Sequence, residues 1–224
     1  NSKRIKKKNL FLLNGKPLIW YSIQAAKKIK NISKIVVSSD DEQILSYSAK
    51  FGVDILKRPE KFAKSTSQQE EVIINAIEFY KKKDLNFKYI ILLQPTSPLR
   101  KSKDIINCMK IIKKKGVNSV LSAYEKKMFL WQKKNKTYLP LNYNPKNRPR
   151  SQKLKSFMIE NGAIYIFNTK IFLQKKNRII KNLQIYTMPE EVSVDIDHLK
   201  DLKKAEAIIK NDCPIQILIF YFDN

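Results

Sequence analysis

The 224-residue sequence predicts an α/β fold with a doubly wound, mainly parallel sheet. Short apolar runs alternate with stretches of helical periodicity at the spacing of βαβ units, and this alternation is typical of parallel strands joined by crossover helices. The composition is 43% hydrophobic, which is enough for a buried core. The alternation is broken between residues 125 and 160. We therefore expect one core that carries one insertion.

Several short apolar runs bounded by polar or turn residues are predicted to be strands. These runs are 34–38, 53–55, 90–93, 117–123, 161–167 and 184–187. Helical periodicity between them predicts the crossover helices. The predicted helices are 18–29, 42–51, 67–82, 102–115, 169–175 and 198–210.

The core is assigned to residues 1–124 and 161–212. Residues 125–160 contain Trp131, Tyr138, prolines and many lysines, with the alternation typical of a hairpin. We expect this insertion to cover a site or to contact a partner chain. The apolar tail, 213–224, is interpreted as an edge strand or an ill-defined end, and no function is assigned to it.

The formal net charge of +25 indicates a possible anionic partner, such as nucleic acid or an anionic surface. The lysines are scattered in short runs at predicted turns and helix ends, which favours a solvated surface. The same charge would help to attract a polyanionic substrate. A basic nucleic-acid-binding module stays as an alternative, although the sequence has no nucleic-acid recognition motif and we expect no nucleic-acid partner.

The few cysteines and histidines and the lack of a long apolar stretch limit the class of protein further. Cys108 and Cys213 are far apart and lack metal-binding spacing, which fits a reducing compartment. The single histidine, His198, excludes a metal site built from several histidines. No apolar stretch reaches the roughly 18 residues of a membrane span, and no signal peptide is recognisable. We expect a cytoplasmic protein without membrane insertion.

The most informative motif is the strand end at residues 90–100, Ile-Ile-Leu-Leu-Gln-Pro-Thr-Ser-Pro-Leu-Arg. Four apolar residues predict a buried strand, and a polar turn follows that Pro95 and Pro98 make rigid. Open α/β sheets bind ligands at such strand ends. The alternative is an ordinary loop between a strand and a helix.

A pair of carboxylates, Asp195 and Asp197, is the second motif. On a strand, residues two apart lie on one face, about 7 Å apart at their Cα atoms. Hard oxygen ligands of this kind suit Mg²⁺ bound together with substrate phosphates. The alternative is a helix N-cap, because Asp197 precedes a predicted helix.

Two basic segments complete the set of candidate motifs. The N-terminal Ser/Lys/Asn segment, residues 1–9, is either a loop that holds a triphosphate or a frayed basic tail. It is not a P-loop, because GxxxxGK[ST] is absent, and GxGxxG is absent as well. Arg148, Arg150 and Gln152 in the insertion either bind a carboxylate or lie on a solvated surface.

Taken in order, these motifs resemble the acylneuraminate cytidylyltransferase family, which makes CMP-activated sialic acids and related sugar acids. The residues that carry the resemblance are Asn1-Ser-Lys, Lys8-Asn9, Leu13-Asn-Gly-Lys-Pro-Leu18, Val36-Val-Ser-Ser-Asp40, Lys57-Arg-Pro59, Leu93-Gln-Pro-Thr-Ser-Pro-Leu-Arg100, Arg150-Ser-Gln152, Glu160-Asn-Gly-Ala-Ile-Tyr165 and Ser193-Val-Asp-Ile-Asp197. The ordered set covers about residues 1–210. The resemblance places the family's first strand before Asn1.

The resemblance implies a fold, a reaction and an assembly. The fold would be that of the nucleotide-diphospho-sugar transferases, with a small dimerisation insertion that reaches over the partner's site in a homodimer. The reaction would join CTP to an acidic nine-carbon 2-keto sugar, of the N-acetylneuraminic or legionaminic type, with release of pyrophosphate and with Mg²⁺ as cofactor. Pseudaminic acid and the eight-carbon 3-deoxy-octulosonic acid are the alternative acceptors.

The resemblance also implies a role for each motif residue. The catalytic residues would be Lys8, Gln94 and Asp197. The residues at CTP would be Ser2, Lys8, Asn9, Arg58, Gln94, Pro95, Thr96 and Ser97. The residues at the sugar acid would be Gln94, Arg150, Gln152 and Asn161, and the Mg²⁺ ligands would be Asp195 and Asp197.

Overall fold

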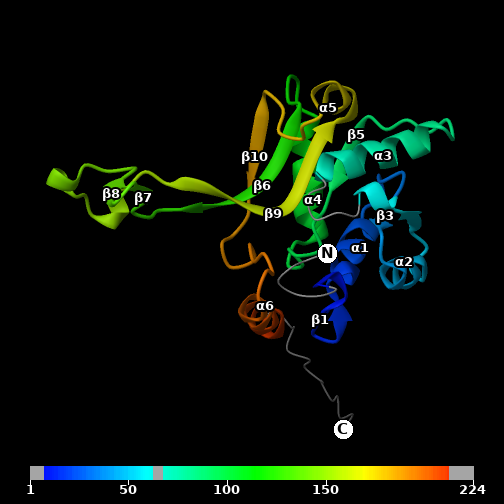
Figure 1. Ribbon diagram of the computed structural model, residues 1–224, viewed down its shortest axis with the longest axis horizontal. Helices are drawn as coiled ribbons and strands as arrows, with labels where there is room; N and C mark the ends of the chain where they lie inside the picture. Colours follow the sequence, from blue (N-terminus) through cyan, green and yellow to red (C-terminus); the bar gives the residue numbers. More distant parts are fainter. Residues whose placement is uncertain (1–7, 63–67, 212–224) are drawn as a thin grey trace, which may run out of the picture.

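The computed structural model describes residues 8–62 and 68–211 (Figure 1). These residues form an α/β core, as predicted, and a long arm that projects from one side of its sheet. Ser2 and the tail 213–224 lie outside the described residues.

The central sheet has the strand order β10-β6-β9-β5. Its strands are β5 (Tyr89–Leu92), β6 (Ser119–Lys126), β9 (Phe157–Asn168) and β10 (Leu183–Thr187). A separate parallel pair is formed by β3 (Val36–Ser39) and β4 (Asp54–Lys57). A short antiparallel pair near the start of the chain is formed by β1 (Leu12–Leu13) and β2 (Lys16–Pro17).

Helices lie close to the predicted ranges, because the 3.6-residue periodicity of their apolar side chains fixes the buried face. They are α1 (Leu18–Lys27), α2 (Glu42–Ala49), α3 (Gln69–Lys81), α4 (Ser102–Ile112), α5 (Thr169–Lys175) and α6 (Leu199–Asn211). Short 3₁₀ turns are η1 (Lys8–Leu10), η2 (Glu60–Phe62), η3 (Pro145–Asn147) and η4 (Ser151–Lys153).

The helices cover both faces of the central sheet. Helices α1 and α4 pack on one face, where Ile105 and Cys108 are fully buried against β6 and β9. Helices α3 and α5 pack on the other face, where Phe167 of β9 contacts Phe172 of α5 at 4.7 Å between ring centroids. The doubly wound arrangement therefore follows from apolar faces on helices that cross over on opposite sides.

The direction of β9 corrects the expectation of a mainly parallel sheet. Strand β9 runs antiparallel to both β5 and β6, whereas β10 is parallel to β6. The central sheet is therefore mixed. Both faces of β9 are buried, so its apolar run has the appearance of a parallel strand in the sequence.

The carboxylate pair was considered on a strand, and Ser193–Asp197 belong to no strand of the structure. Asp197 lies at a bend, and α6 begins two residues after it. Alternation nevertheless holds, because Val194 and Ile196 are buried and Asp195 is exposed. The side chain that caps α6 is Asp201, which accepts hydrogen bonds from the N–H groups of Asp197 and His198 at 3.1 and 2.7 Å.

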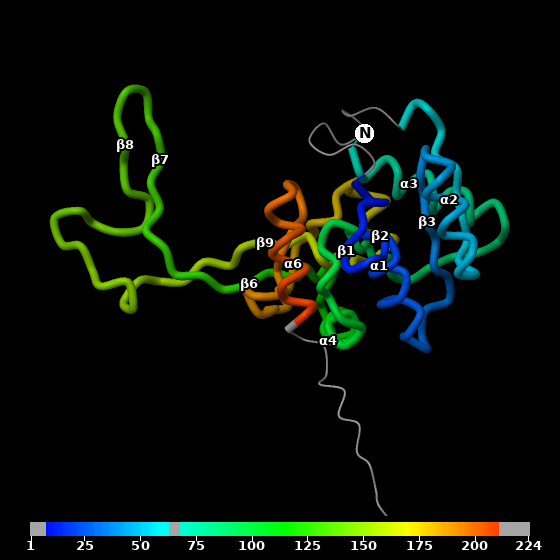
Figure 2. The backbone as a smooth tube through the Cα atoms, turned by 90° about the horizontal axis from the view of Figure 1, so that it is seen from below, coloured from blue at the N-terminus to red at the C-terminus, as the bar shows by residue number. Residues whose placement is uncertain are grey.

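Residues 125–160, called the arm below, form the predicted hairpin. Its strands β7 (Trp131–Lys134) and β8 (Thr137–Pro140) pair with each other (Figure 1), and β6 and β9 run out into its base. Figure 2 shows the same arm from below as an extension that stands apart from the helices. Among the described helices, none is long and apolar enough to cross a membrane.

Candidate active site at the end of strand β5

The turn Gln94–Arg100 leaves the end of β5 and is tied to two distant parts of the chain. Ser97 is buried, and its hydroxyl donates to the carbonyl of Asn161 at 3.0 Å. The carbonyl of Thr96 accepts a hydrogen bond from the N–H of Ile196 at 2.7 Å. The turn, which its two prolines were predicted to make rigid, is therefore hydrogen-bonded directly to the segment that contains Asp195 and Asp197.

The carboxylate segment is joined in turn to the start of the described chain. Lys8, in η1, donates from Nζ to Oδ1 of Asp197 at 2.8 Å. The side chain of Lys8 is 16% exposed and that of Asp197 is 42% exposed. Three motifs that are separated by 189 positions from first to last thus meet at one place.

Asn161 is the buried residue that holds these segments to the sheet. Its Oδ1 accepts from the hydroxyl of Ser122 at 2.7 Å and from the N–H of Ala163 at 3.2 Å. Its Nδ2 donates to the hydroxyl of Ser193 at 2.9 Å. Because both ends of this amide are used inside the protein, we expect Asn161 to position its neighbours, and its contact with the sugar stays a prediction.

Gly162 sets the place of the Gln94 side chain. A Cβ at position 162 would lie 2.5 Å from Oε1 of Gln94, and the residue has φ +69°. Glycine adopts this φ at low cost, and its lack of a Cβ leaves room for the end of the Gln94 side chain. The Gln94 amide therefore lies directly against the backbone of β9. The name site frame is used below for the Gln94–Arg100 turn, residues 161–163 and residues 193–197.

Arg100 is a buried residue of the site frame that the sequence prediction left without a role. Its guanidinium donates to the carbonyl of Ala163 at 2.7 Å, to the hydroxyl of Ser22 at 2.9 Å and to the carbonyl of Gln94. The side chain is 3% exposed. Burial lowers its pKa to about 9.

A second polar cluster missed by the sequence prediction lies on the α3 side of β9. The hydroxyl of Tyr165 donates to Glu160, and burial is the main reason why its pKa is raised. The guanidinium of Arg178 lies 4.8 Å from the Tyr165 ring centroid and pairs with Glu70 at 2.6 Å. Three separate segments supply these residues, because Glu160 and Tyr165 share β9, and the pairing of that strand with Glu70 and Arg178 depends on contacts far apart in the sequence.

Arg58, which was predicted to lie near the nucleotide, directly follows β4. It donates to the carbonyl of Ser38 at 3.0 Å and lies 4.0 Å from a carboxylate oxygen of Asp40. Its Nε atom is buried without a hydrogen-bond partner among the described residues. Asn9 lies beside Lys8 in η1, so both predicted phosphate contacts are on one short turn.

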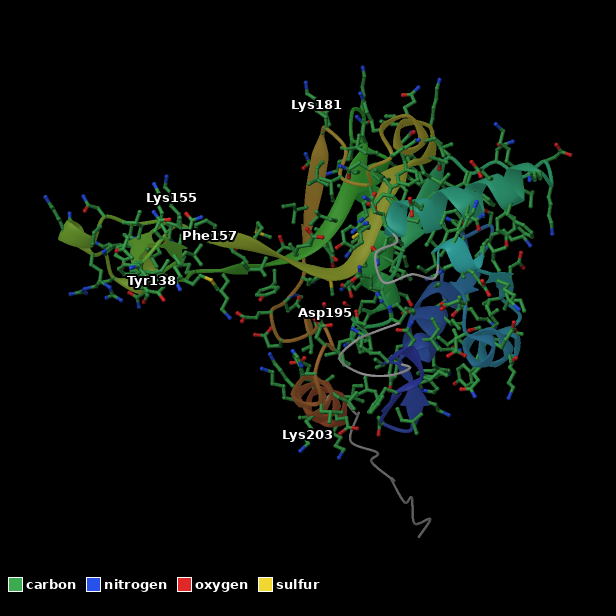
Figure 3. The ribbon with its side chains drawn as sticks, viewed as in Figure 1. Tyr138, Lys155, Phe157, Lys181, Asp195 and Lys203 are labelled. Carbon is green, nitrogen blue, oxygen red and sulfur yellow. The ribbon has the colours of Figure 1, made fainter. Side chains whose placement is uncertain are left out.

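Arg150 and Gln152 are not brought to Gln94 of the same chain. Both are exposed and belong to the arm, which points away from the helices (Figure 3, where Tyr138 and Lys155 mark the arm). The carbonyl of Gln152 accepts from Lys127 at 2.8 Å, a contact within the arm. The predicted sugar-binding residues are therefore split between the site frame and the arm.

The carboxylates fit a magnesium ion that takes most of its ligands from phosphate and water. Within the described residues, no group of three or more metal-binding side chains gathers. Magnesium is commonly held by one or two carboxylates plus substrate phosphates, so Asp195 and Asp197 are a sufficient protein set. Lys8 already places one positive charge at Asp197, in keeping with a site for charged phosphates.

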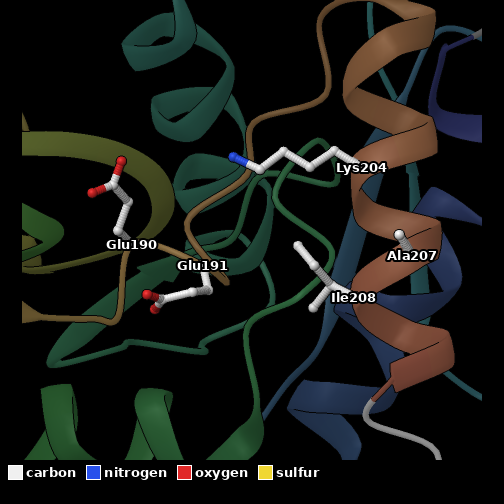
Figure 4. Close-up of a pocket in the computed structure, with 5 residues that line it drawn as sticks. All are labelled: Glu190, Glu191, Lys204, Ala207 and Ile208. Atoms are coloured by element: carbon white, nitrogen blue, oxygen red, sulfur yellow. The ribbon is translucent and has the colours of Figure 1, made fainter.

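A hollow beside the carboxylate segment contains none of the predicted site residues. It is lined by Glu190 and Glu191 on one side and by Lys204, Ala207 and Ile208 of α6 on the other (Figure 4). Glu190 also pairs with Lys126 at the base of the arm. We assign no substrate to this hollow.

Comparison with known proteins decides the family. Residues 1–221 match the sequence profile of the family described as cytidylyltransferase. The chain belongs to the cytidylyltransferase family. The resemblance read from the ordered motifs is confirmed by this match and by the relatives that follow.

Curated relatives of this chain differ in the sugar acid that their names contain. The N-acylneuraminate cytidylyltransferase of Escherichia coli O18:K1:H7 is 31% identical, with 92% of this chain and 49% of that protein covered. The CMP-N,N'-diacetyllegionaminic acid synthase of Legionella pneumophila is 30% identical, with 93% and 92% covered. The pseudaminic acid cytidylyltransferase of Campylobacter jejuni is 28% identical, with 93% and 92% covered.

The chain spans about half the length of the N-acylneuraminate cytidylyltransferases that it matches. Solved structures support the fold. A CMP:2-keto-3-deoxy-manno-octonic acid synthetase complexed with CTP has a TM-score of 0.67 at 14% identity, with 95% of each chain covered. The 4-diphosphocytidyl-2C-methyl-D-erythritol synthase of Anaerococcus prevotii has a TM-score of 0.62 at 12% identity, with 90% of this chain and 93% of that chain covered.

Proposed function

We propose that the protein transfers CMP from CTP to the anomeric hydroxyl of an acidic nine-carbon 2-keto sugar and releases pyrophosphate. The observation that carries the proposal is the meeting of Lys8, the Gln94 turn and Asp197 through two short hydrogen bonds. A basic residue, a strand-end turn and a carboxylate pair at one place suit the binding of a nucleoside triphosphate. The family match supports cytidine as the nucleoside.

In this reaction the sugar oxygen forms a bond to the α-phosphorus while the bond to the β-phosphate oxygen breaks. The hydroxyl gives up its proton, and pyrophosphate leaves on the opposite side. Catalysis of this kind depends on positioning and on neutralising the phosphate charge. No side chain of the site frame needs to form a covalent intermediate.

On the nucleotide side, Lys8, Asn9 and Ser2 would contact the phosphates, and Arg58 would lie near the nucleotide. Lys8 is held by Asp197, so its charge already lies beside the carboxylates. Asp195 and Asp197 would hold Mg²⁺, which when bound would neutralise phosphate charge.

On the sugar side, Gln94 would stand between nucleotide and acceptor, with its amide in the room that the missing Cβ of Gly162 leaves at the strand end. Pro95, Thr96 and Ser97 would shape the floor under both substrates. Their carbonyl and hydroxyl groups hold the turn to Ile196 and Asn161.

We further propose a homodimer in which the arm reaches the partner's site. Large apolar side chains are exposed on the arm, with Trp131 53% and Tyr138 60% exposed. Arg150 and Gln152 point away from the site frame of their own chain, so a partner's site is where they could meet an acidic sugar. The cytoplasmic location stays a prediction.

The test of the function is CTP-dependent release of pyrophosphate with a panel of acids. The panel contains N-acetylneuraminic, legionaminic, pseudaminic and 3-deoxy-octulosonic acids, and we expect turnover with one of the first two. Release with pseudaminic or 3-deoxy-octulosonic acid alone would change the acceptor and keep the reaction. No release with any acid, together with salt-sensitive nucleic-acid binding that CTP does not displace, would favour a nucleic-acid-binding module.

A further inference from the structure

We propose that Arg100 is a positioning residue for Gln94. It acts by hydrogen bonding at once to the turn that carries Gln94 and to strand β9, on which the Gln94 side chain packs. This inference rests on the proposed function. The guanidinium donates to the carbonyl of Gln94 on the turn and to the carbonyl of Ala163 on β9. Between these two points lies Gly162, against which the Gln94 amide rests.

A third hydrogen bond makes this arrangement specific for arginine. Nη1 of Arg100 donates to the hydroxyl of Ser22 in α1 at 2.9 Å. The acceptors therefore come from a helix, a turn and a strand, and the planar fork of the guanidinium reaches all three at once. The single ammonium of a lysine cannot span the same acceptors.

The electrostatics indicate that Arg100 is not there for stability alone. All three of its hydrogen-bond acceptors are neutral, and the negative charge of Asp104 acts on the guanidinium and opposes the lowering of its pKa. Burying a charge is costly, and replacing a buried ion pair by apolar side chains of similar volume often leaves a protein as stable or more so. Its burial lowers its pKa to about 9, which reflects that cost. A role in geometry explains why a guanidinium occupies this place.

A change in the position of the turn would also affect other parts of the site frame. Ser97 and Thr96, in the middle of the same turn, hold Asn161 and Ile196. A shift of the Gln94 carbonyl would therefore move the amide at the strand end first and the carboxylate segment second. We expect catalysis to suffer more than the binding of CTP.

The experiment compares Arg100→Lys with Arg100→Met, and uses Ile112→Val as a control. Ile112 is buried at the end of α4 that is distant from the turn, and its loss of one methylene lowers stability without removing a hydrogen bond of the site frame. Each variant is assayed below its own melting temperature. We expect Arg100→Lys to lower kcat by roughly 10- to 100-fold, because misplacement by about 1 Å has effects of this size. KM for CTP should change by less than about threefold, and the control should keep its kcat.

A double-mutant cycle with Gln94→Ala identifies the route. If Arg100 acts through Gln94, Arg100→Lys should add little loss once the Gln94 side chain is removed. The proposal would be overturned if the fold-losses in kcat of the two single variants multiplied fully in the double variant. An unchanged kcat in folded Arg100→Lys would overturn it as well. If both Arg100 variants fail to fold, Gly162→Ala disturbs the same contact from β9 and must reproduce the selective loss of kcat. Wild-type turnover is measured first, so a failure of the proposed reaction is seen before any variant is compared.

Discussion

The site frame and the arm contain the two halves of the predicted site in opposite physical conditions. The inner residues of the site frame, Ser97, Arg100 and Asn161, are buried, and Asn161 and Arg100 each join several distant segments. The arm is held by its own aromatic cluster, in which Tyr143 lies 4.9 Å from Phe129 and 5.8 Å from Trp131 between ring centroids. The site frame can hold its functional side chains in place within one chain, whereas the arm presents exposed side chains to which a second chain could bind.

This difference indicates which part of the reaction one chain can prepare alone. Lys8 and Asp197, which are proposed for the phosphates and the metal, meet within the chain at 2.8 Å. Residues for the sugar acid do not converge, because Arg150 lies on the arm. We infer that nucleotide binding belongs to the single chain and that binding of the sugar depends on a second copy.

The largest expected effect comes from the carboxylates of the site frame. Asp197→Ala should lower pyrophosphate release by more than the 10- to 100-fold that is typical of outer-shell changes at metal sites, because it removes a proposed magnesium ligand and the partner of Lys8. The measurement is kcat over a range of Mg²⁺ concentrations, with thermal unfolding to verify the fold. Asp84→Asn is the matched control, since Asp84 is exposed at a turn with φ 58°, where asparagine is tolerated. Retained turnover in Asp197→Ala would remove this residue from the metal site.

A mixed dimer tests the division between frame and arm directly. Asp197→Ala and Arg150→Ala chains are co-expressed with two tags, and the heterodimer is purified through both. If the arm serves the partner's site, each heterodimer has one intact site, and about half of the wild-type activity should return. Each homodimer should remain weak, with Arg150→Ala affected mainly in KM for the sugar acid. Absence of recovery would place Arg150 at the site of its own chain, whereas a fully active Arg150→Ala homodimer would place it at no site.

The sequence predicted the helices and the convergence of the motifs better than the direction of the strands. Periodicity placed α5 at its observed range, Thr169–Lys175, because one apolar face is buried in each helix. The direction of β9 could not be predicted, because an apolar run buried on both faces has the same pattern in parallel and antiparallel sheets. Likewise, Ser193–Asp197 alternate between buried and exposed side chains without forming a strand.

Arg100 illustrates what a linear reading of the site misses. Its neighbour Lys101 is exposed, and a Leu-Arg-Lys sequence before a helix is typical of a surface turn. The acceptors that bury the guanidinium are 78, 63 and 6 positions away in the sequence. Gly162 was recognised as part of a motif, but its need for a missing Cβ depends on the position of Gln94 in space. The identity of site residues could therefore be predicted, while the contacts that hold them could not.

A smaller effect is expected on the arm, where a change should alter assembly before catalysis. Trp131→Glu places a charge on an exposed aromatic position, and we expect the dimer dissociation constant to rise by roughly 30-fold or more if this face is the interface. Sedimentation velocity at several concentrations measures the change. Lys134→Glu, an equally exposed position on the same strand, is the control for the added charge. A dimer that is unaffected by Trp131→Glu would exclude this face, and activity should fall only as the dimer dissociates.

The smallest effect is expected where polar contacts lie outside both regions. Asp54 of β4 accepts from Lys34 at 3.3 Å and from the hydroxyl of Tyr80 at 2.8 Å, and these hydrogen bonds, that from Lys34 first, lower its pKa. Because the folded pKa is below the unfolded one, the stabilisation is present above about pH 4 and is lost as the pH falls through the folded pKa. The side chain is 38% exposed, so Asp54→Asn should lower the free energy of unfolding at pH 7 by less than about 1 kcal/mol.

Urea unfolding of wild type and Asp54→Asn between pH 7 and pH 3 measures this contribution, and the gap between the two should close toward the acid end. The kcat of the variant should equal that of the wild type, because Asp54 contacts neither the site frame nor the arm in the hydrogen bonds described for it. A loss of kcat without loss of stability would mean that the β3–β4 pair reaches the catalytic geometry. Residues that affect catalysis would then include the β3–β4 pair, which the described hydrogen bonds do not connect to Gln94.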